Sequence, residues 1–299
     1  MSTRQELKVG IIGLDTSHSI EFTRRTQAPD CPPDQRVEGM RVINCLRFPS
    51  PFQSEPDQDK RQKQMEEWGV KVTKDIGESL EGIDAIMLEI NDPSLHLKYF
   101  KEVMDEEKPI FLDKPPADNL KNAKEIFSLA DEKKLRIFSA SSLRFSPEVI
   151  HLSADASKPK IAMSIGPLGK PPAGSGIIWY GVHAAEMLQG IMGTGAKKVL
   201  ARKDPLGIVS MIEYSNGRRG IVQLNDSDYC YALLAQGEQG IKFFNVDTSF
   251  LYTDLLKRIK EFFKGAEPTV SMAESLEIQG ILDAIEKSVN EGKEQPIIL

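Results

Sequence analysis

Short apolar runs alternate with stretches of helical period through the first half of the chain, and this alternation constrains the fold most. The runs lack polar alternation, as strands buried on both faces do; they are Leu7–Gly13, Val42–Leu46, Ala85–Ile90, Pro109–Leu112 and Arg136–Ser139. The stretches between them with helical character include Gln53–Trp68, Ser94–Met104 and Asp118–Lys134. Such strand–helix–strand alternation predicts an α/β domain with a doubly wound parallel sheet over residues 1–145.

The pattern changes from about Ser146, and the 299 residues leave room for a second domain. Several β-like runs follow without long helices between them: VLARK, GIVSMIEY, GIVQL, YALLAQ and IKFF. Ser215, Asn216 and Gly217 separate two of these runs and are typical of a hairpin turn. Residues 146–299 are therefore expected to form an α+β domain on a mainly antiparallel sheet, with a last helix over Ser271–Asn290.

Composition excludes several classes of protein. Lys and Arg number 38 against 44 Asp and Glu, so the basic footprint of a nucleic-acid-binding protein is absent. The three cysteines are too few and too scattered for a disulfide framework or a paired zinc knuckle. The N-terminal apolar run is too short for a signal peptide, and no window approaches a membrane span. We therefore expect a cytoplasmic protein that binds neither nucleic acid nor membrane.

The loop after the first predicted strand stands where a dinucleotide phosphate loop would lie. It reads Gly13, Leu14, Asp15, Thr16, Ser17, His18. Gly13 matches the first glycine of G-x-G-x-x-G, but Asp15 and His18 stand at the other two positions. A carboxylate at the closest approach to pyrophosphate costs affinity unless it turns away. The alternative interpretation is that Asp15, Thr16 or Ser17 caps the next helix.

Asp113 and Lys114 follow the strand Pro109–Leu112 directly. A side chain at the carboxyl end of a parallel strand points into the crevice where open sheets bind ligands. Pro115 and Pro116 fix the backbone behind it, and an ammonium group there can share a proton with a substrate hydroxyl or stabilise an alkoxide. The alternative is a solvated lysine in a proline turn.

Two further segments carry polar residues at places where ligands bind. Asn91 to His96 follow the fourth predicted strand, and His183 and Glu186 lie three residues apart on one face of a predicted helix. A histidine beside glycine at a loop–helix junction is an acid/base candidate, although a packed or capping histidine is the alternative. Asp15, His18 and His183 lack the spacing of metal ligands, so no metal site is predicted.

Six segments, in this order, resemble the family of glucose–fructose oxidoreductase and inositol dehydrogenase (Gfo/Idh/MocA) over nearly the whole chain. The segments are LKVGIIGLD, NDPSLH, FLDKPPA, SLRFSP, GVHAAEML and the tail EPTVSMAESLEIQGILDAIEKS. FLDKPPA is similar to the family's Glu-Lys-Pro motif, with Asp113 in place of Glu. GVHAAEML is similar to its Gly-x-His-x-x-Asp/Glu helix.

The resemblance implies a Rossmann-like first domain and NAD(P)-linked oxidation or reduction of a sugar, cyclitol or related polyol. Lys114 and His183 would then be the catalytic residues. The cofactor side would be lined by Gly13, Leu14, Asp15, Thr16, Ser17, His18, Asn91, His96 and Asp113. Trp179, where many members have Asp, could stack on a sugar ring, with Tyr180 beside it on the substrate side. Relatives pair through the antiparallel sheet, which implies a homodimer or homotetramer.

Departures from the family pattern leave two questions open. Arg47 stands at the end of the second predicted strand, where an acid would bind the ribose hydroxyls, and this favours NADP slightly over NAD. The altered phosphate loop also suits a relative that has lost dinucleotide binding. Such a protein would be a lyase, a hydrolase or a small-ligand-binding protein.

Overall fold

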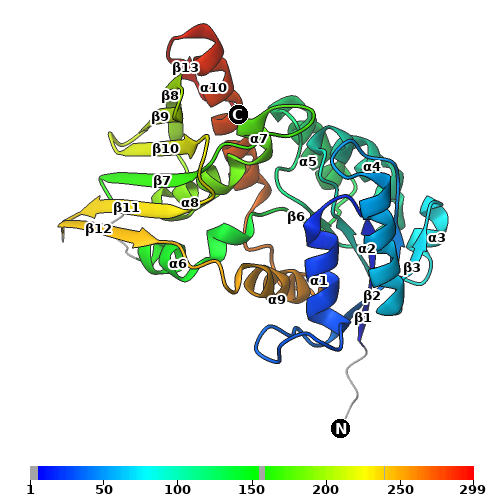
Figure 1. Ribbon diagram of the computed structural model, residues 1–299. Helices are drawn as coiled ribbons and strands as arrows, with labels where there is room; N and C mark the ends of the chain where they lie inside the picture. The colour runs from blue at the N-terminus through cyan, green and yellow to red at the C-terminus, as the bar shows by residue number, and fades with distance from the viewer. Residues whose placement is uncertain (1–5, 155–158, 239) are drawn as a thin grey trace. The chain divides into compact units, whose positions relative to one another are not determined.

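The computed structural model of the chain describes residues 6–154, 159–238 and 240–299 (Figure 1). Residues 155–158, part of the predicted loop between the domains, lie outside the described residues. The chain forms two compact units, and neither is continuous in sequence. The first unit contains the chain up to Ala117, then Lys124–Ser139 and Tyr252–Met272; the second contains Asp118–Ala123, Ala140–Leu251 and Ala273–Leu299.

A six-stranded parallel sheet forms the centre of the first unit. Its strands are β1 (Leu7–Ile12), β2 (Met40–Leu46), β3 (Lys71–Thr73), β4 (Ala85–Leu88), β5 (Ile110–Leu112) and β6 (Ile137–Phe138). They lie in the order β3-β2-β1-β4-β5-β6, which confirms the predicted doubly wound sheet. The chain reverses its direction of travel across the sheet between β1 and β4, which are neighbours. Ligands of such sheets bind at this switch point, outside the carboxyl ends of the strands.

The helices of the first unit are α1 (Ser17–Gln27), α2 (Glu55–Glu67), α3 (Ile76–Leu80), α4 (His96–Val103) and α9 (Leu251–Phe263), while most of α5 (Leu120–Glu132) also belongs to this unit. Of these, α2, α4 and α5 occupy the predicted stretches with small shifts at their ends. The Ser54 side chain caps α2 by accepting a hydrogen bond from the Asp57 amide. The same helix ends just before Gly69. Its φ of 83° lies in the left-handed region, which glycine adopts most easily.

Helix α9 is a departure from the expected domain layout, because Tyr252–Met272 belongs to the first unit rather than to the second. Its apolar stripe is buried, and the Phe262 ring lies 5.7 Å from that of Phe138 on β6. The Arg25 side chain on α1 donates a hydrogen bond to Thr253 at 3.1 Å. The first unit therefore needs a segment that follows the end of β6 by more than a hundred residues in the sequence.

A seven-stranded sheet forms the second unit, in the order β12-β11-β7-β10-β9-β8-β13. The strands are β7 (Ile161–Pro167), β8 (Ala196–Asp204), β9 (Gly207–Tyr214), β10 (Arg219–Asn225), β11 (Ala232–Gly237), β12 (Gly240–Asn245) and β13 (Gln295–Pro296). All neighbours are antiparallel except β7 and β10. β9 and β10 form the predicted hairpin around Asn216 and Gly217. The mainly antiparallel sheet of the second domain is thus confirmed.

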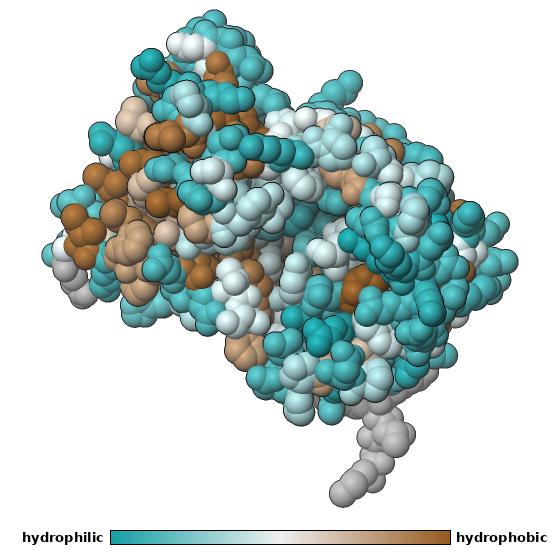
Figure 2. All heavy atoms as spheres, viewed as in Figure 1, coloured by the Kyte–Doolittle hydropathy of each residue, from teal (hydrophilic) through white to brown (hydrophobic). Residues whose placement is uncertain are grey.

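One face of this sheet carries the core of the second unit. Helix α8 (Val182–Met192) packs against β7 and β10 and is buried along almost its whole length. The remaining helices are α6 (Pro147–Ser153), α7 (Gly176–Trp179) and α10 (Met272–Glu291). In contrast, several large apolar side chains of the strands are exposed to solvent: Leu200, Val209, Met211, Ile241 and Phe243. Brown side chains gather over these strands in Figure 2. Within the described residues, no helix is both long and apolar enough to cross a bilayer.

Candidate functional site

The loop after β1 turns sharply at Gly13, where the backbone of Glu89, directly after β4, lies against it. Gly13 has a φ of 116°, and a Cβ atom there would lie 2.1 Å from the carbonyl oxygen of Glu89. Only glycine fits this position. The Thr16 side chain caps α1 by accepting a hydrogen bond from the His18 amide at 3.2 Å, so the cap is Thr16 and neither Asp15 nor Ser17. The remaining amides of the first turn have no intrahelical acceptor and form a typical anion-binding site.

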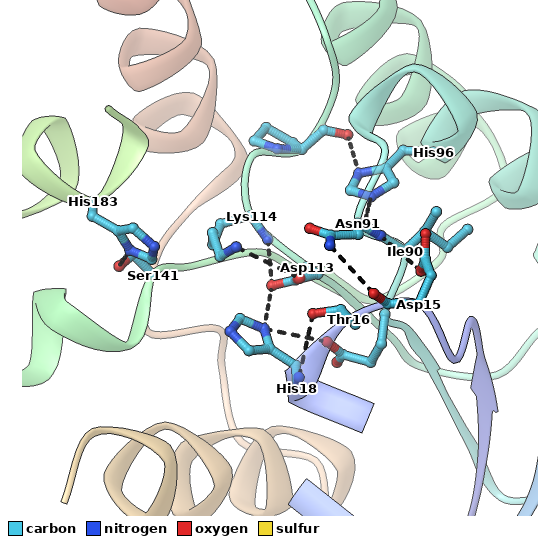
Figure 3. Close-up of polar contacts among 12 residues, drawn as sticks. Asp15, Thr16, His18, Ile90, Asn91, His96, Asp113, Lys114, Ser141 and His183 are labelled. Atoms are coloured by element: carbon cyan, nitrogen blue, oxygen red, sulfur yellow. Dashed lines mark hydrogen bonds and ion pairs between the residues drawn. The ribbon is translucent and has the colours of Figure 1, made fainter. Parts of the chain in front are cut away.

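The Asp15 carboxylate turns into the protein rather than towards this anion-binding site. Its side chain is 1% exposed and accepts hydrogen bonds from the Ser50 hydroxyl at 2.6 Å and the Asn91 amide at 3.1 Å. The Asn91 side chain in turn donates to the Asp15 carbonyl at 3.3 Å (Figure 3). Burial raises the pKa of Asp15 above its usual value. The residue expected to repel a pyrophosphate thus joins the loops after β1 and β4.

The His18 ring also lies inside the first unit, packed against the rings of Phe22 and Tyr252. Its Nδ1 atom lies 2.9 Å from Oδ1 of Asp113 and 3.6 Å from Oε2 of Glu89. Burial opposes a charge on the ring, but the Asp113 carboxylate and its hydrogen bond outweigh burial and raise the pKa of His18. The His18 side chain therefore faces two carboxylates.

Asp113 and Lys114 follow β5, as the sequence predicts. Asp113 Oδ1 accepts a hydrogen bond from the Lys114 amide at 2.8 Å, and the Lys114 ammonium lies 3.8 Å from Oδ2. Burial alone would raise the pKa of Asp113, but the His18 and Lys114 charges hold it well below its usual range. The Lys114 side chain is only 8% exposed, so the alternative of a solvated lysine in a turn is wrong. The Lys114–Pro115 peptide bond is cis.

Glu89, directly after β4, is a residue of this site that the sequence reasoning missed. It is fully buried, and neither of its carboxylate oxygens has a hydrogen-bond partner. Burial and the nearby Asp113 carboxylate raise the pKa of Glu89 to about 7. The sequence does contain a signal for it, a single acidic residue inside the apolar run Ala85–Ile90. A charged group in a strand buried on both faces is costly unless a specific partner compensates it.

His96, predicted on the cofactor side, is fully buried at the start of α4. Its Nε2 atom lies 2.8 Å from the Ile90 carbonyl oxygen and its Nδ1 atom 3.2 Å from that of Pro116. The ring therefore joins the loop after β4 to the loop after β5, and both of its nitrogens face backbone acceptors (Figure 3). This arrangement fixes the backbone around Asn91 and Lys114.

Arg47 lies directly after β2, where the sequence places it, but two acids hold its guanidinium. Its nitrogens lie 2.6 Å from Glu55 and 2.7 Å from Asp59, and it donates a further hydrogen bond to Gln62 at 2.8 Å. Burial lowers the pKa of Arg47, but the bonds to Asp59 and Glu55 outweigh burial and raise it. A phosphate that bound here would have to displace both carboxylates.

The second unit holds His183 in the first turn of α8. Its Nδ1 atom lies 2.6 Å from the Ser141 hydroxyl, and the Ser141 amide donates to the Glu186 carboxylate at 3.0 Å. His183 and Glu186 thus meet the same residue, as their spacing on one helix face predicts. Burial raises the pKa of Glu186 to about 7, although Arg144 lowers it. Ser141 was not predicted; its signal was its place three residues after the end of the buried strand β6.

Aromatic rings flank His183 within the second unit. The Tyr180 ring lies 4.9 Å from the His183 ring, edge to face, and the Trp179 ring lies 5.1 Å from that of Tyr180. His183 is 6% exposed, so it is a packed histidine as well as an acid/base candidate. The place of Trp179 and Tyr180 on the substrate side stays a prediction.

The residues after β1 fit a bound dinucleotide despite the loss of two glycines. Gly13 keeps the turn tight, and the Asp15 charge is directed away from the first amides of α1. His18 stands at the third glycine position, and its Nδ1 atom lies within hydrogen-bond distance of Asp113 Oδ1, at 2.9 Å. The loop therefore keeps the tight turn that a dinucleotide phosphate loop needs.

Comparison with known proteins gives a family match over part of the chain. Residues 54–141 match the GFO_IDH_MocA family model, described as an oxidoreductase family with an NAD-binding Rossmann fold. The YceM protein of Salmonella typhimurium is 27% identical over 92 residues, which is 31% of this chain and 30% of that relative.

Solved structures resemble the chain over nearly its whole length. GenD2 from gentamicin A biosynthesis, in complex with NAD, has a TM-score of 0.80 at 13% identity and covers 99% of this chain and 97% of its own. Scyllo-inositol dehydrogenase from Lactobacillus casei, with NAD(H) and scyllo-inositol, has a TM-score of 0.79 at 12% identity, covering 98% and 99%. These likenesses show the fold. In sequence, residues 54–141 match the NAD-binding model of the Gfo/Idh/MocA oxidoreductase family.

Proposed function

We propose that the protein is an NAD-dependent oxidoreductase that acts on a CH–OH group of a sugar, cyclitol or related polyol by hydride transfer. The observation that carries this proposal is the buried Lys114 ammonium, which lies at the end of β5 with the Asp113 carboxylate 3.8 Å away. The family match and the loop geometry support the cofactor class. The polyol class follows from the inositol dehydrogenase of similar fold.

Each candidate side chain has a role that its contacts support. A bound nicotinamide would accept or supply the hydride. The Lys114 ammonium would donate a hydrogen bond to the reacting oxygen and stabilise negative charge on it. Asp113, whose pKa is lowered so that it remains ionised, lies 3.8 Å from that ammonium.

His183 is the proposed acid/base group for the hydroxyl proton. The Ser141 hydroxyl fixes its ring through Nδ1, so proton transfer would fall to Nε2. Ser141 is then a positioning residue, and its amide is itself held by Glu186.

NAD rather than NADP follows from the surroundings of Arg47. Glu55 and Asp59 already neutralise its guanidinium, and their side chains would repel a 2′-phosphate. Carboxylates near the end of β2 can instead accept hydrogen bonds from the ribose hydroxyls. Replacing Glu55 and Asp59 together by glutamine and asparagine should therefore shift the preference towards NADPH.

A homodimer or homotetramer is proposed through the exposed face of the seven-stranded sheet. In a sheet that packs one face on a core and exposes the other to solvent, the strands alternate apolar and polar residues. The exposed positions here include apolar residues instead: Val209 and Met211 on β9 and Phe243 on β12. Apolar residues at these positions are typical of a surface covered by a second subunit.

The proposal is tested by calorimetric titration of the protein, freed of any co-purified nucleotide, with NADH and with NADPH. We expect micromolar binding of NADH and weaker binding of NADPH. A panel of polyols is then screened for reduction of NAD⁺. Lys114→Met should lose at least about 100-fold in turnover while it keeps NADH binding, because the ammonium acts on the substrate oxygen.

Lys74→Met, at an exposed lysine of the same unit, serves as the matched control and should leave turnover unchanged. Full activity of the Lys114 variant would refute the role of the ammonium. A folded protein that binds neither nucleotide would instead favour the alternative of a lyase, a hydrolase or a small-ligand-binding protein.

A further inference from the structure

The Glu89 carboxylate is the least explained group in the first unit. It is fully buried, and both of its oxygens lack a hydrogen-bond partner. Buried carboxylates are costly unless they are hydrogen-bonded, paired or bound to a metal ion. The nearest cationic group is the His18 ring, 3.6 Å away, and that ring is hydrogen-bonded to Asp113 instead.

His18, Glu89 and Asp113 bring three ligand atoms to one point, although they come from three separate segments of the chain. One atom from each side chain lies within 4.8 Å of the other two, and all three residues are buried. Two ligands bound to one ion at about 2.1 Å lie about 3.0–3.4 Å apart. The Nδ1–Oδ1 distance of 2.9 Å and the Nδ1–Oε2 distance of 3.6 Å are close to this range.

We propose that His18 Nδ1, Glu89 and Asp113 bind a divalent transition metal ion. One imidazole and two carboxylates suit manganese, iron or zinc, and the nitrogen ligand disfavours magnesium and calcium. The ion replaces the proton between His18 and Asp113, and that proton leaves to solvent. Both Glu89 oxygens then have a use, since one binds the ion and the other can accept from a bound water.

The charges around the ion indicate what completes its coordination. Two carboxylates and the Lys114 ammonium sum with a divalent ion to one positive charge, the neutral His18 adding none. A buried excess of positive charge is reduced by an anionic ligand. Three protein ligands also leave coordination positions open. The fourth ligand is therefore expected to be an oxygen anion, such as hydroxide or a substrate carboxylate or alkoxide.

This inference goes beyond the proposed function and does not depend on it. The site uses residues of the first unit alone, and metal binding can be measured without dinucleotide or substrate. A protein that binds NADH but no metal would leave the proposed function intact. Conversely, a protein that binds the metal but no dinucleotide would support the site and refute the oxidoreductase.

The test uses Mn²⁺, because free Mn²⁺ gives a six-line EPR spectrum that is lost on binding and because thiols such as that of Cys230 bind it poorly. Protein stripped with chelator and dialysed is titrated with MnCl₂. We expect about one ion bound per chain, with Mg²⁺ in excess unable to displace it. Pulsed EPR of the bound ion should show coupling to an imidazole nitrogen.

Variants locate the site. Glu89→Gln and His18→Gln should each weaken Mn²⁺ binding at least about 10-fold, because each removes a ligand. His151→Gln is the matched control, since His151 is an exposed histidine of the second unit, and it should bind as the unmodified chain does. Circular dichroism checks that each variant is folded.

Three results would overturn the proposal: an unchanged spectrum of free Mn²⁺ at millimolar protein, binding that survives in both ligand variants, or bound Mn²⁺ without nitrogen coupling. The last measurement uses the unmodified chain, so it decides the question even if a variant does not fold.

Discussion

Glu186 should make the stability of the second unit depend on pH in an unusual direction. Burial raises the pKa of its carboxyl from 4.5 to about 7. Between these values the folded protein holds a proton that the unfolded chain releases. The free energy of unfolding therefore falls as the pH rises through this window. A carboxylate in a salt bridge has a lowered pKa in the folded protein, so the free energy of unfolding would instead rise with pH.

Replacing Glu186 by glutamine removes this dependence. Glutamine stays neutral at all pH values, and its side-chain oxygen can still accept the hydrogen bond from the Ser141 amide. A pKa rise from 4.5 to about 7 corresponds to about 3 kcal/mol. Relative to the unmodified chain, the variant should thus gain about 3 kcal/mol of stability between about pH 4 and about pH 8. Arg144, 3.6 Å from the carboxylate, is already included in this difference, since it lowers the pKa.

Urea unfolding at a series of pH values measures the effect. The chain has two tryptophans, and Trp179 belongs to the same unit as Glu186. A Trp68→Phe background makes Trp179 the only tryptophan reporter, so the transition followed is that of the second unit. Glu38→Gln, at an exposed carboxylate, is the control and should run parallel to its parent. Parallel pH curves for Glu186→Gln and its parent would refute the reasoning, because the carboxyl would then be ionised as readily in the folded protein as in the unfolded chain.

Three further changes test other parts of the structure. Gly13→Ala should lower the free energy of unfolding by about 3 kcal/mol, measured by urea titration, because its Cβ would meet the Glu89 carbonyl oxygen. Asp15→Gly should cost about 1–3 kcal/mol of stability without tightening NADH binding, since it leaves the Asn91 amide without its acceptor; tighter binding by calorimetry would show that the carboxylate faces the cofactor. Phe243→Lys should shift the protein towards monomer in sedimentation velocity, and an unchanged oligomer would place the interface elsewhere.

Much of the fold follows from local sequence signals. The parallel strands are readable because burial on both faces leaves continuous apolar runs, and Lys114 lies at the end of β5 because Pro115 stops the strand. Helix α9 was missed, since its stripe is amphipathic but it follows a series of β-like runs. No local signal tells that its partners are Arg25 and Phe138, more than a hundred residues earlier.

The candidate site shows the same division. The positions of Gly13, Asp113 and Lys114 follow from their motifs, but the directions of their neighbours' side chains do not. Asp15 turns inward because Ser50 and Asn91 supply donors from other loops. Glu89 becomes visible as a partner of His18 only when β1, β4 and β5 are aligned in one sheet. The order of the strands in the sheet decides which strand ends meet, and a local sequence pattern does not reveal that order.

The discontinuous first unit has a consequence for how the chain folds during synthesis. Helix α9 covers part of that unit with an apolar stripe, and its residues leave the ribosome only after most of the second unit has been made. Until then the nascent sheet presents uncovered apolar surface around Phe138, which is the kind of surface that chaperones bind. A fragment that ends at residue 145 should accordingly aggregate, whereas one in which a linker joins it to residues 250–272 should remain in solution.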